Sequence, residues 1–210
     1  MADWSTIASL STAGGTLVLA VATFSSVRSA NRAARVAETS LLAGLRPLLV
    51  PSRLEDPPEK VGFADSHWMR IPGGQGVADV TDEVIYLGIA IRNVGSGIAV
   101  LDGWSLFAAR ALGDTPHADP TEFRRLTRDI YVPPSDQGFW QGALRDQADP
   151  MFTAMREVIE ARGQFTVDVL YRDYEGGQRM ITRFSWAPRS DEGWIISVGR
   201  HWNLDRPDPR

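Results

Sequence analysis

The sequence predicts a mainly β protein with helices. A long N-terminal transmembrane helix is expected to precede an immunoglobulin-like antiparallel β-sandwich that carries one extra α-helix. Three observations support this: residues 4–27 lack charged side chains, later segments alternate apolar and polar residues, and 13 prolines and 19 glycines indicate many turns. We expect residues 1–45 to form the transmembrane helix and a juxtamembrane helical stalk, and residues 46–210 the β-sandwich domain.

The uncharged run from Trp4 to Val27 is long enough to cross a bilayer, for which a helix needs roughly 20 residues. A cleaved signal peptide would begin with positive charge, whereas the first basic residue is Arg28. A buried amphipathic helix would show a charged face, which this run lacks. Ser, Thr and Gly dilute the first half of the run, so a soluble helix is the alternative to a single-pass membrane helix.

The charges that flank this run predict its orientation. Arg28, Arg32 and Arg35 follow it directly and are the candidate membrane-flanking residues, whereas only Asp3 precedes it. The positive-inside rule then places the N-terminus outside the cell membrane and the main domain in the cytoplasm. The bilayer is therefore one expected partner. Small residues spaced four apart in the run would also permit helix association, so a homo-oligomer is left open.

Period-two alternation marks the expected strands. Ile85, Leu87, Ile89 and Ile91 would share one face of a strand over Val84–Val94. The other expected strands are Leu48–Val50, Ile98–Ala108, Phe165–Tyr171, Met180–Trp186 and Trp194–Val198, with a further hairpin of 67–71 and 76–80 around Pro72–Gln75.

The extra helix is expected to begin after Asp149, a residue suited to an N-cap, with Pro150 in the first helical position and Gly163 beyond its end. Two glycine-containing turns, at 93–97 and 173–177, are expected to close hairpins in which glycine supplies a positive φ.

The segments containing these turns carry a resemblance. Ile91-Arg92-Asn93-Val94-Gly95-Ser96-Gly97-Ile98-Ala99 and Tyr171-Arg172-Asp173-Tyr174-Glu175-Gly176 resemble a pattern of uncharacterised actinobacterial-type membrane-anchored proteins. Those proteins join an N-terminal helix to a small immunoglobulin-like β-sandwich. The resemblance implies fold and topology, and it implies no activity and no functional residues.

Composition excludes several classes of function. The chain has no cysteine, which removes disulfides, thiol nucleophiles and iron–sulfur clusters. Residues 51–210 carry 18 basic and 24 acidic side chains without a basic stripe, so no nucleic-acid partner is expected. His67, His117 and His201 are not spaced as metal ligands. No cofactor, metal or catalytic residue is therefore assigned.

One basic and aromatic segment stands out within the acidic domain. Arginine together with exposed aromatic residues is the composition of protein-interaction hot spots. The candidate partner-binding residues are Arg124, Arg125, Arg128, Tyr131 and Trp140. The alternative is that these aromatic side chains pack inward.

The sequence thus predicts a membrane-anchored, non-catalytic binding or scaffold protein with an unknown protein partner. Two alternatives remain. One is a carboxylate-dependent hydrolase in the β domain, in which Asp129, Asp173 and Glu175 converge. The other is a signalling stalk whose helices associate in the membrane.

Overall fold

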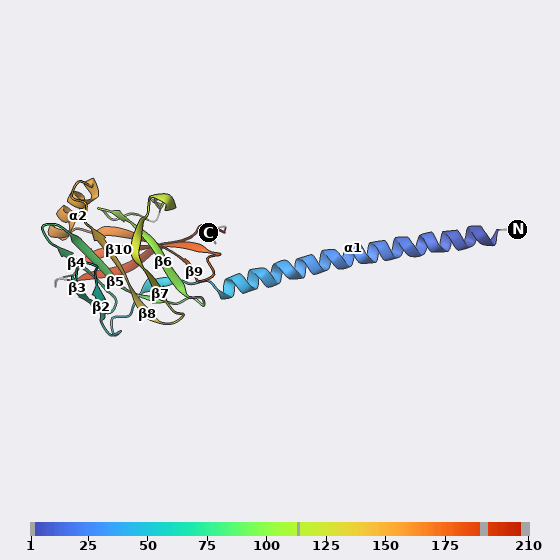
Figure 1. The fold of residues 1–210 in the computed structure, drawn as a ribbon, viewed down its shortest axis with the longest axis horizontal. Coiled ribbons are helices and arrows are strands. Elements are labelled where there is room, and N and C mark those ends of the chain that lie inside the picture. The colour runs from blue at the N-terminus through green and yellow to red at the C-terminus, as the bar shows by residue number, and fades with distance from the viewer. Residues whose placement is uncertain (1–2, 113, 190–192, 207–210) are drawn as a thin grey trace. The chain divides into compact units, whose positions relative to one another are not determined.

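A computed structural model describes residues 3–112, 114–189 and 193–206, and for residues 4–12 it describes the backbone alone. The chain divides into two compact units, Met1–Ala43 and Gly44–Arg210. Figure 1 labels most of their helices and strands. In chain order the elements are α1 (Trp4–Gly44), β1 (Leu49–Pro51), β2 (Glu59–Gly62), β3 (Trp68–Ile71), β4 (Gln75–Val80), β5 (Ile85–Asn93), β6 (Ala99–Phe107), the short 3-10 helix η1 (Pro120–Glu122), β7 (Arg124–Val132), β8 (Gln137–Leu144), α2 (Pro150–Glu160), β9 (Phe165–Asp173), β10 (Arg179–Pro188) and β11 (Trp194–Asn203).

The first unit confirms the predicted N-terminal helix. Alanine is the commonest residue of its second half, and it favours helix, as do the leucines and arginines there. In the part of the chain whose side chains are described, no helix is long and apolar enough to cross a membrane. The predicted run Trp4–Val27 begins within residues 4–12, whose side chains lie outside that part. The prediction is therefore confirmed in that this segment is a helix, and its crossing of a membrane stays a prediction.

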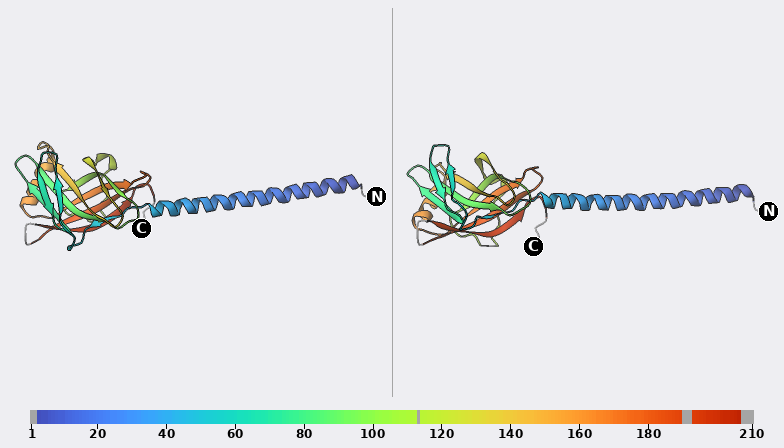
Figure 2. Two further views of the ribbon diagram at one scale, coloured as in Figure 1. Left: turned by 60° about the horizontal axis from the view of Figure 1, so that its bottom comes forward. Right: turned by 90° about the horizontal axis from the view of Figure 1, so that it is seen from below.

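The second unit is built on one nine-stranded sheet in which every pairing of the described residues is antiparallel. Its strand order is β7-β6-β9-β10-β11-β4-β5-β8, with β1 beside the end of β5. The sheet curls until its end strands β7 and β8 lie close together, although no ladder joins them in the described residues (Figure 2). This confirms the antiparallel β fold.

These nine strands form one continuous curled sheet and not two unconnected ones. The reason lies at β11, whose whole length pairs with β10 while its first two residues also pair with β4. Trp194 lies opposite Gly76, and Ile195 lies opposite Gln75. A Cβ at Gly76 would meet Trp186 at 2.6 Å, so glycine permits this close approach. The ladder therefore continues from β10 through β11 to β4.

The core lies inside the curl. Ile85, Leu87, Ile89 and Ile91 point into it together, as the alternation of β5 predicts. The opposite face of β5 is also covered, because the β2–β3 hairpin packs over it. Residues on this second layer are Val61, Phe63, Met69, Ile71, Tyr86 and Ala90. Both faces of β5 are therefore buried.

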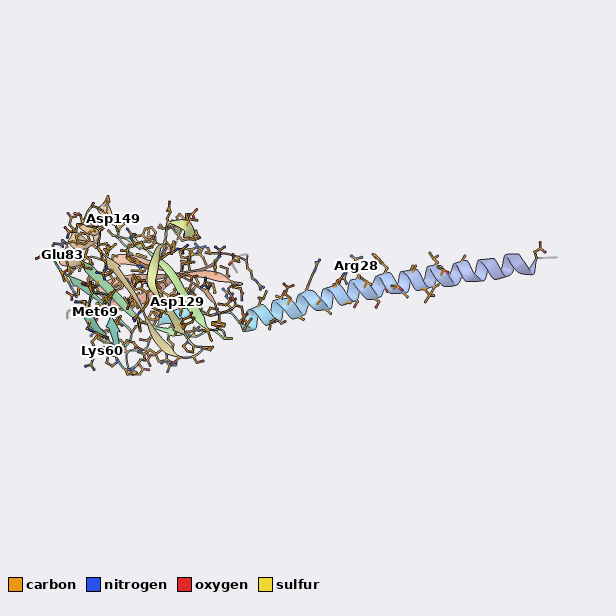
Figure 3. All side chains as sticks on the ribbon, in the orientation of Figure 1. Arg28, Lys60, Met69, Glu83, Asp129 and Asp149 are labelled. Atoms are coloured by element: carbon orange, nitrogen blue, oxygen red, sulfur yellow. The ribbon has the colours of Figure 1, made fainter. Side chains whose placement is uncertain are left out.

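Helix α2 begins as predicted. The Asp149 carboxylate, labelled in Figure 3, accepts a hydrogen bond from the Met151 N–H at 2.8 Å. Phe152, Met155 and Ile159 are buried on its inner face. The chain leaves the helix through Arg162, at a φ of 54°, before it reaches Gly163.

Two of the predicted hairpins are wrong. Strand β3 pairs with β2 rather than β4, although a turn with Gly74 at a φ of 67° does connect β3 to β4. Strands β5 and β6, on either side of residues 94–97, do not pair with each other: β5 pairs with β1, β4 and β8, and β6 pairs with β7 and β9. The hairpin between β9 and β10 is confirmed, with Gly176 at a φ of 74°.

The loop 94–97 instead packs against the chain that enters the domain. A Cβ at Gly95 would overlap the backbone of Arg46 to Leu48, and one at Gly97 would overlap the Leu45 carbonyl. Neither glycine has a positive φ. Glycine is therefore needed here for close approach of two backbones, not for turn geometry.

The Asn93 side chain joins these segments. Its amide NH₂ donates to the carbonyls of Gly97 at 2.7 Å and Val132 at 3.0 Å. Its oxygen accepts from the N–H groups of Leu48 at 3.0 Å and Gly95 at 2.9 Å.

We predict that Asn93→Ala lowers the free energy of unfolding by about 2–3 kcal/mol, because it leaves buried backbone donors and acceptors without partners. Urea denaturation of the full chain measures this loss. The matched control is Ser96→Ala, at an exposed side chain in the same loop. Equal midpoints for Asn93→Ala and wild type would contradict the role given to Asn93.

Candidate functional site

Strands β6 and β7 separate in the middle of their ladder. Leu101 pairs with Ile130, and the next registered pair is Gly103 with Arg125. Asp102 alone therefore lies opposite the four residues 126–129. Asp102 is also the extra residue of β6 on its other side, where Leu101 faces Tyr171 and Gly103 faces Leu170. Bulges of this kind re-aim side chains and often border functional sites.

A cleft of about 430 Å³ opens at this separation. Its charged lining consists of four arginines and two aspartates from β6, β7, β9 and β10. These residues are Asp102, Arg125, Arg128, Asp129, Arg172 and Arg179, and Figure 3 labels Asp129 among them. Leu101, Phe123, Leu126 and Leu170 supply apolar lining. The volume falls within the usual range of small-ligand clefts.

Two of the four arginines that line the cleft form ion pairs with aspartates. Arg172 lies 3.3 Å from Asp102, and Arg179 lies 2.7 Å from Asp205. Burial raises the pKa of Asp102 above its ordinary value; Arg172 opposes this rise, and the neighbouring Asp129 charge adds to it.

Arg125 and Arg128 differ in how they are engaged. Arg128 donates to the Gln141 side-chain oxygen at 2.8 Å, and its guanidinium lies 5.2 Å from the Phe139 ring centre. Among the described residues, Arg125 forms neither a hydrogen bond nor an ion pair, and it is exposed. Its planar guanidinium is therefore available to an anionic group.

Two exposed tyrosines lie beside the cleft. Tyr131 is 51% exposed and Tyr174 is 64% exposed, with ring centres 6.4 Å apart. Val100 of β6 pairs with Tyr131 on one side and with Arg172 on the other. Tyr131, Val100 and Arg172 therefore form one row across the sheet. We call this surface the arginine face. It comprises Arg125, Arg128, Tyr131, Arg172, Tyr174 and Arg179 around the cleft.

Two predicted partner-binding residues lie elsewhere. Arg124 pairs with Asp149 at the start of α2 and lies over the Trp104 ring, 5.5 Å from its centre. Trp140 is fully buried and contacts Trp104 edge-on, with ring centres 5.6 Å apart. It points to the core because it pairs with Ile89, which is itself a core residue. Trp140 is thus a core residue, and Arg124 joins β7 to α2.

The predicted carboxylate group does not assemble. Asp173 is buried, and it accepts hydrogen bonds from the Gly177 N–H at 2.8 Å and the Gln178 amide at 3.1 Å. It therefore closes the β9–β10 hairpin, and Glu175 is exposed in the same turn. Only Asp129 reaches the cleft, where its carboxylate neighbour is Asp102.

The histidines also remain separate. His67 stacks on Tyr86 with ring centres 3.9 Å apart, His117 lies near Trp202, and His201 shares a hydrogen bond with Thr182. Within the described ranges, no three His, Asp or Glu side chains gather as metal ligands.

The predicted membrane-flanking residues lie together on α1. Arg28, Arg32 and Arg35 are exposed on its second half, and Figure 3 labels Arg28. Their i, i+4 and i+3 spacing brings them to neighbouring positions of the helix surface.

Sequence reasoning missed Asp102, Arg172, Tyr174 and Arg179. One signal was present, because Asp102 interrupts the otherwise apolar run from Ile98 to Leu101 and Gly103 to Trp104. A charged residue within such a run indicates a bulge or a functional position. Arg172 and Arg179 carry no comparable signal, since they reach β7 only through the pairing of β6 with β9 and of β9 with β10.

No model of a known protein family matches this chain, and no curated protein matches it either. The geometry of the arginine face therefore carries the functional argument.

We predict that Asp102→Asn raises the free energy of unfolding at neutral pH. A carboxyl whose pKa is higher in the folded than in the unfolded chain stabilises the fold below the unfolded value, about 3.9, and loses that contribution as pH rises through the folded value. Asparagine cannot ionise, so its advantage should appear at pH 7 and vanish in acid. Urea titrations at both pH values measure it.

Asp205→Asn is the control with opposite sign. Hydrogen bonding to Arg179 lowers the pKa of Asp205, so its ionised form stabilises the fold above the unfolded pKa. This variant should be less stable than wild type at neutral pH, with a difference that shrinks on acidification. An Asp102→Asn protein that is less stable than wild type at pH 7 would refute the first prediction.

Proposed function

We propose that this protein is a membrane-attached, non-catalytic binding or scaffold protein whose β domain engages a protein partner through the arginine face. One observation carries the proposal: Arg125, which is exposed and makes no hydrogen bond or ion pair with the described residues, lines a cleft beside which two exposed tyrosines lie. Arginine and tyrosine are enriched at protein interfaces, and they dominate hot spots.

The domain around this face is acidic, which adds to the argument. Residues 51–210 carry a net charge of −6, whereas the cleft is lined by four arginines and two aspartates. A positively charged patch on an otherwise acidic surface attracts a negatively charged partner and repels positively charged ones.

A carboxylate-dependent hydrolase is the second candidate, and it would use Asp102 and Asp129. The raised pKa of Asp102 beside a second carboxylate favours it. The ion pair with Arg172 argues for a fixed charge at Asp102 instead. Asp102→Asn separates the two candidates, since it should abolish hydrolysis but not partner binding.

Helix α1 supports the membrane attachment. Leu17, Val18 and Leu19 are consecutive residues, each about 67–68% exposed. Consecutive helical positions differ by about 100°, so these side chains point to three different sides of the helix. A short stretch with apolar side chains on several sides suits lipid better than a single protein groove. Arg28, Arg32 and Arg35 then mark the cytoplasmic boundary, and the β domain lies in the cytoplasm.

The partner test uses affinity purification of the full chain from detergent-solubilised membranes. We expect a protein that co-purifies with wild type to be lost with the double variant Arg125→Glu/Tyr131→Ala. The matched control is Arg70→Glu, the same charge reversal at an exposed arginine on β3. Equal recovery of the partner with all three proteins would refute the role of the arginine face.

The attachment test uses alkaline carbonate extraction of cell membranes. Wild type should stay in the membrane pellet, whereas Val18→Arg/Val21→Arg should be released, because each arginine costs about 2.5–3.5 kcal/mol within a bilayer. The control Ala37→Arg places arginine in the second half of the same helix and should stay in the pellet. Release of the wild-type protein would rule out membrane attachment.

Protease treatment of intact cells tests the orientation. The β domain should be protected until the cells are opened. Cleavage of this domain from outside would show that the orientation inferred from the arginines is wrong.

A further inference from the structure

We propose that the partner segment that docks on the arginine face is acidic, and that one of its carboxylates enters the cleft beside Arg125 and Arg172. This inference rests on the proposed function, since it names the chemistry of the partner that this face engages. The cleft and the row of side chains across β7, β6 and β9 support it.

The guanidinium groups of the cleft differ in availability. Arg179 is held by three hydrogen bonds to the Asp205 carboxylate, between 2.7 and 3.3 Å. Arg172 makes a single ion pair at 3.3 Å, and its side chain is 44% exposed. Arg125 forms neither contact within the described residues. Two arginines from different strands can therefore turn their N–H groups towards an incoming anion, and guanidinium groups fit carboxylates in a two-bonded geometry.

The cleft is closed along β7 in both directions. The ladder resumes at Gly103 with Arg125 on one side and at Leu101 with Ile130 on the other. A Cβ at Gly103 would come within 3.0 Å of the Arg124 carbonyl, which shows how closely the two strands approach there. The opening therefore admits a side chain or a small group, but not a continuous strand.

The surroundings of the cleft favour a protein segment over a free small anion. Tyr131 and Tyr174 offer aromatic surface next to Arg172, outside the cleft itself. A free carboxylate or phosphate would leave both rings uncovered. A peptide that places one acidic side chain in the cleft can cover them with its neighbouring residues.

Asp102 and Asp129 limit how much negative charge the cleft accepts. Both carboxylates face the same opening, and each would repel a second anion placed close to it. One carboxylate therefore fits the cleft better than a cluster of carboxylates.

The test is fluorescence anisotropy of the full chain in detergent with a short labelled peptide of alternating glutamate and leucine. We expect saturable binding that weakens by about tenfold in Arg125→Glu and again in Arg172→Glu, and that weakens at high salt. The same peptide with glutamine in place of glutamate should not bind. Arg70→Glu is the matched control and should bind as wild type does. Circular dichroism confirms that each variant is folded.

The salt dependence of peptide binding separates the contribution of the arginine charges from that of the aromatic contacts. Tyr131→Ala should weaken binding of the peptide but leave its salt dependence unchanged, whereas Arg125→Glu should reduce both. Inorganic phosphate and phosphatidylserine vesicles are the competing probes, and neither should displace the peptide at its binding midpoint.

Three results would overturn the inference. They are absence of saturable binding, equal binding of the glutamine peptide, or equal weakening in Arg70→Glu and Arg125→Glu. Displacement by phosphate or by vesicles would assign the cleft to a small anion or to a lipid headgroup instead. If a partner depends on Arg125 and Tyr131 in purification while the acidic peptide does not bind, the proposed function stands and only the acidic chemistry fails.

Discussion

The hydrogen bonds of the Asn93 side chain hold together the strands that build both the core and the cleft. Its amide has two donors and one oxygen with two lone pairs, and all four are used. These bonds tie together Leu48, the loop 94–97 and the end of β7 at Val132. The Asn93 backbone also accepts from Ser135 N–H and donates to the Asp136 carbonyl. One residue thus positions the entering chain, β5 and the β7–β8 turn.

This constraint explains where the cleft lies. Strand β7 is held at Val132 by Asn93 and pairs regularly with β6 back to Ile130. At its other end Arg124 is held by Asp149 and α2. Between these two ends, β7 has four residues, 126–129, opposite the single β6 residue Asp102. The longer segment bows away from β6. The cleft follows from a mismatch in strand length between fixed ends.

The local sequence pattern predicted the positions of strands and helices better than it predicted which strands pair. Alternation in β5 and the cap at Asp149 depend on neighbouring residues, so the sequence contains them directly. The role of Gly95 and Gly97 depends on Leu45 to Leu48, a segment about fifty residues earlier. A glycine pair beside an asparagine looks like a turn, and nothing local distinguishes it from a point of close backbone contact.

The site was predictable only within β7. Arg125, Arg128 and Tyr131 are close in sequence, and their composition indicated an interaction surface. Trp140 was misplaced because the choice between core and surface for an aromatic residue depends on the face to which its partner strand points. Arg172 and Arg179 reach the same surface only through the pairing of β6 with β9 and β9 with β10.

The arginines of this domain show how burial separates a structural role from a binding role. Arg183 is fully buried, and it donates five hydrogen bonds to Asp168 and to the carbonyls of Leu112, Thr115 and Pro116. Those bonds satisfy its guanidinium and hold the loop after β6 against the sheet, so Arg183 has no capacity left for a ligand. Arg125 lies on the outer rim of the same sheet with its donors facing solvent. Water compensates those donors in the free protein, and a carboxylate can replace that water with two charge-assisted bonds. Arg125 is therefore assigned to recognition because its N–H donors have no hydrogen-bond partner among the described residues, whereas those of Arg183 are all used.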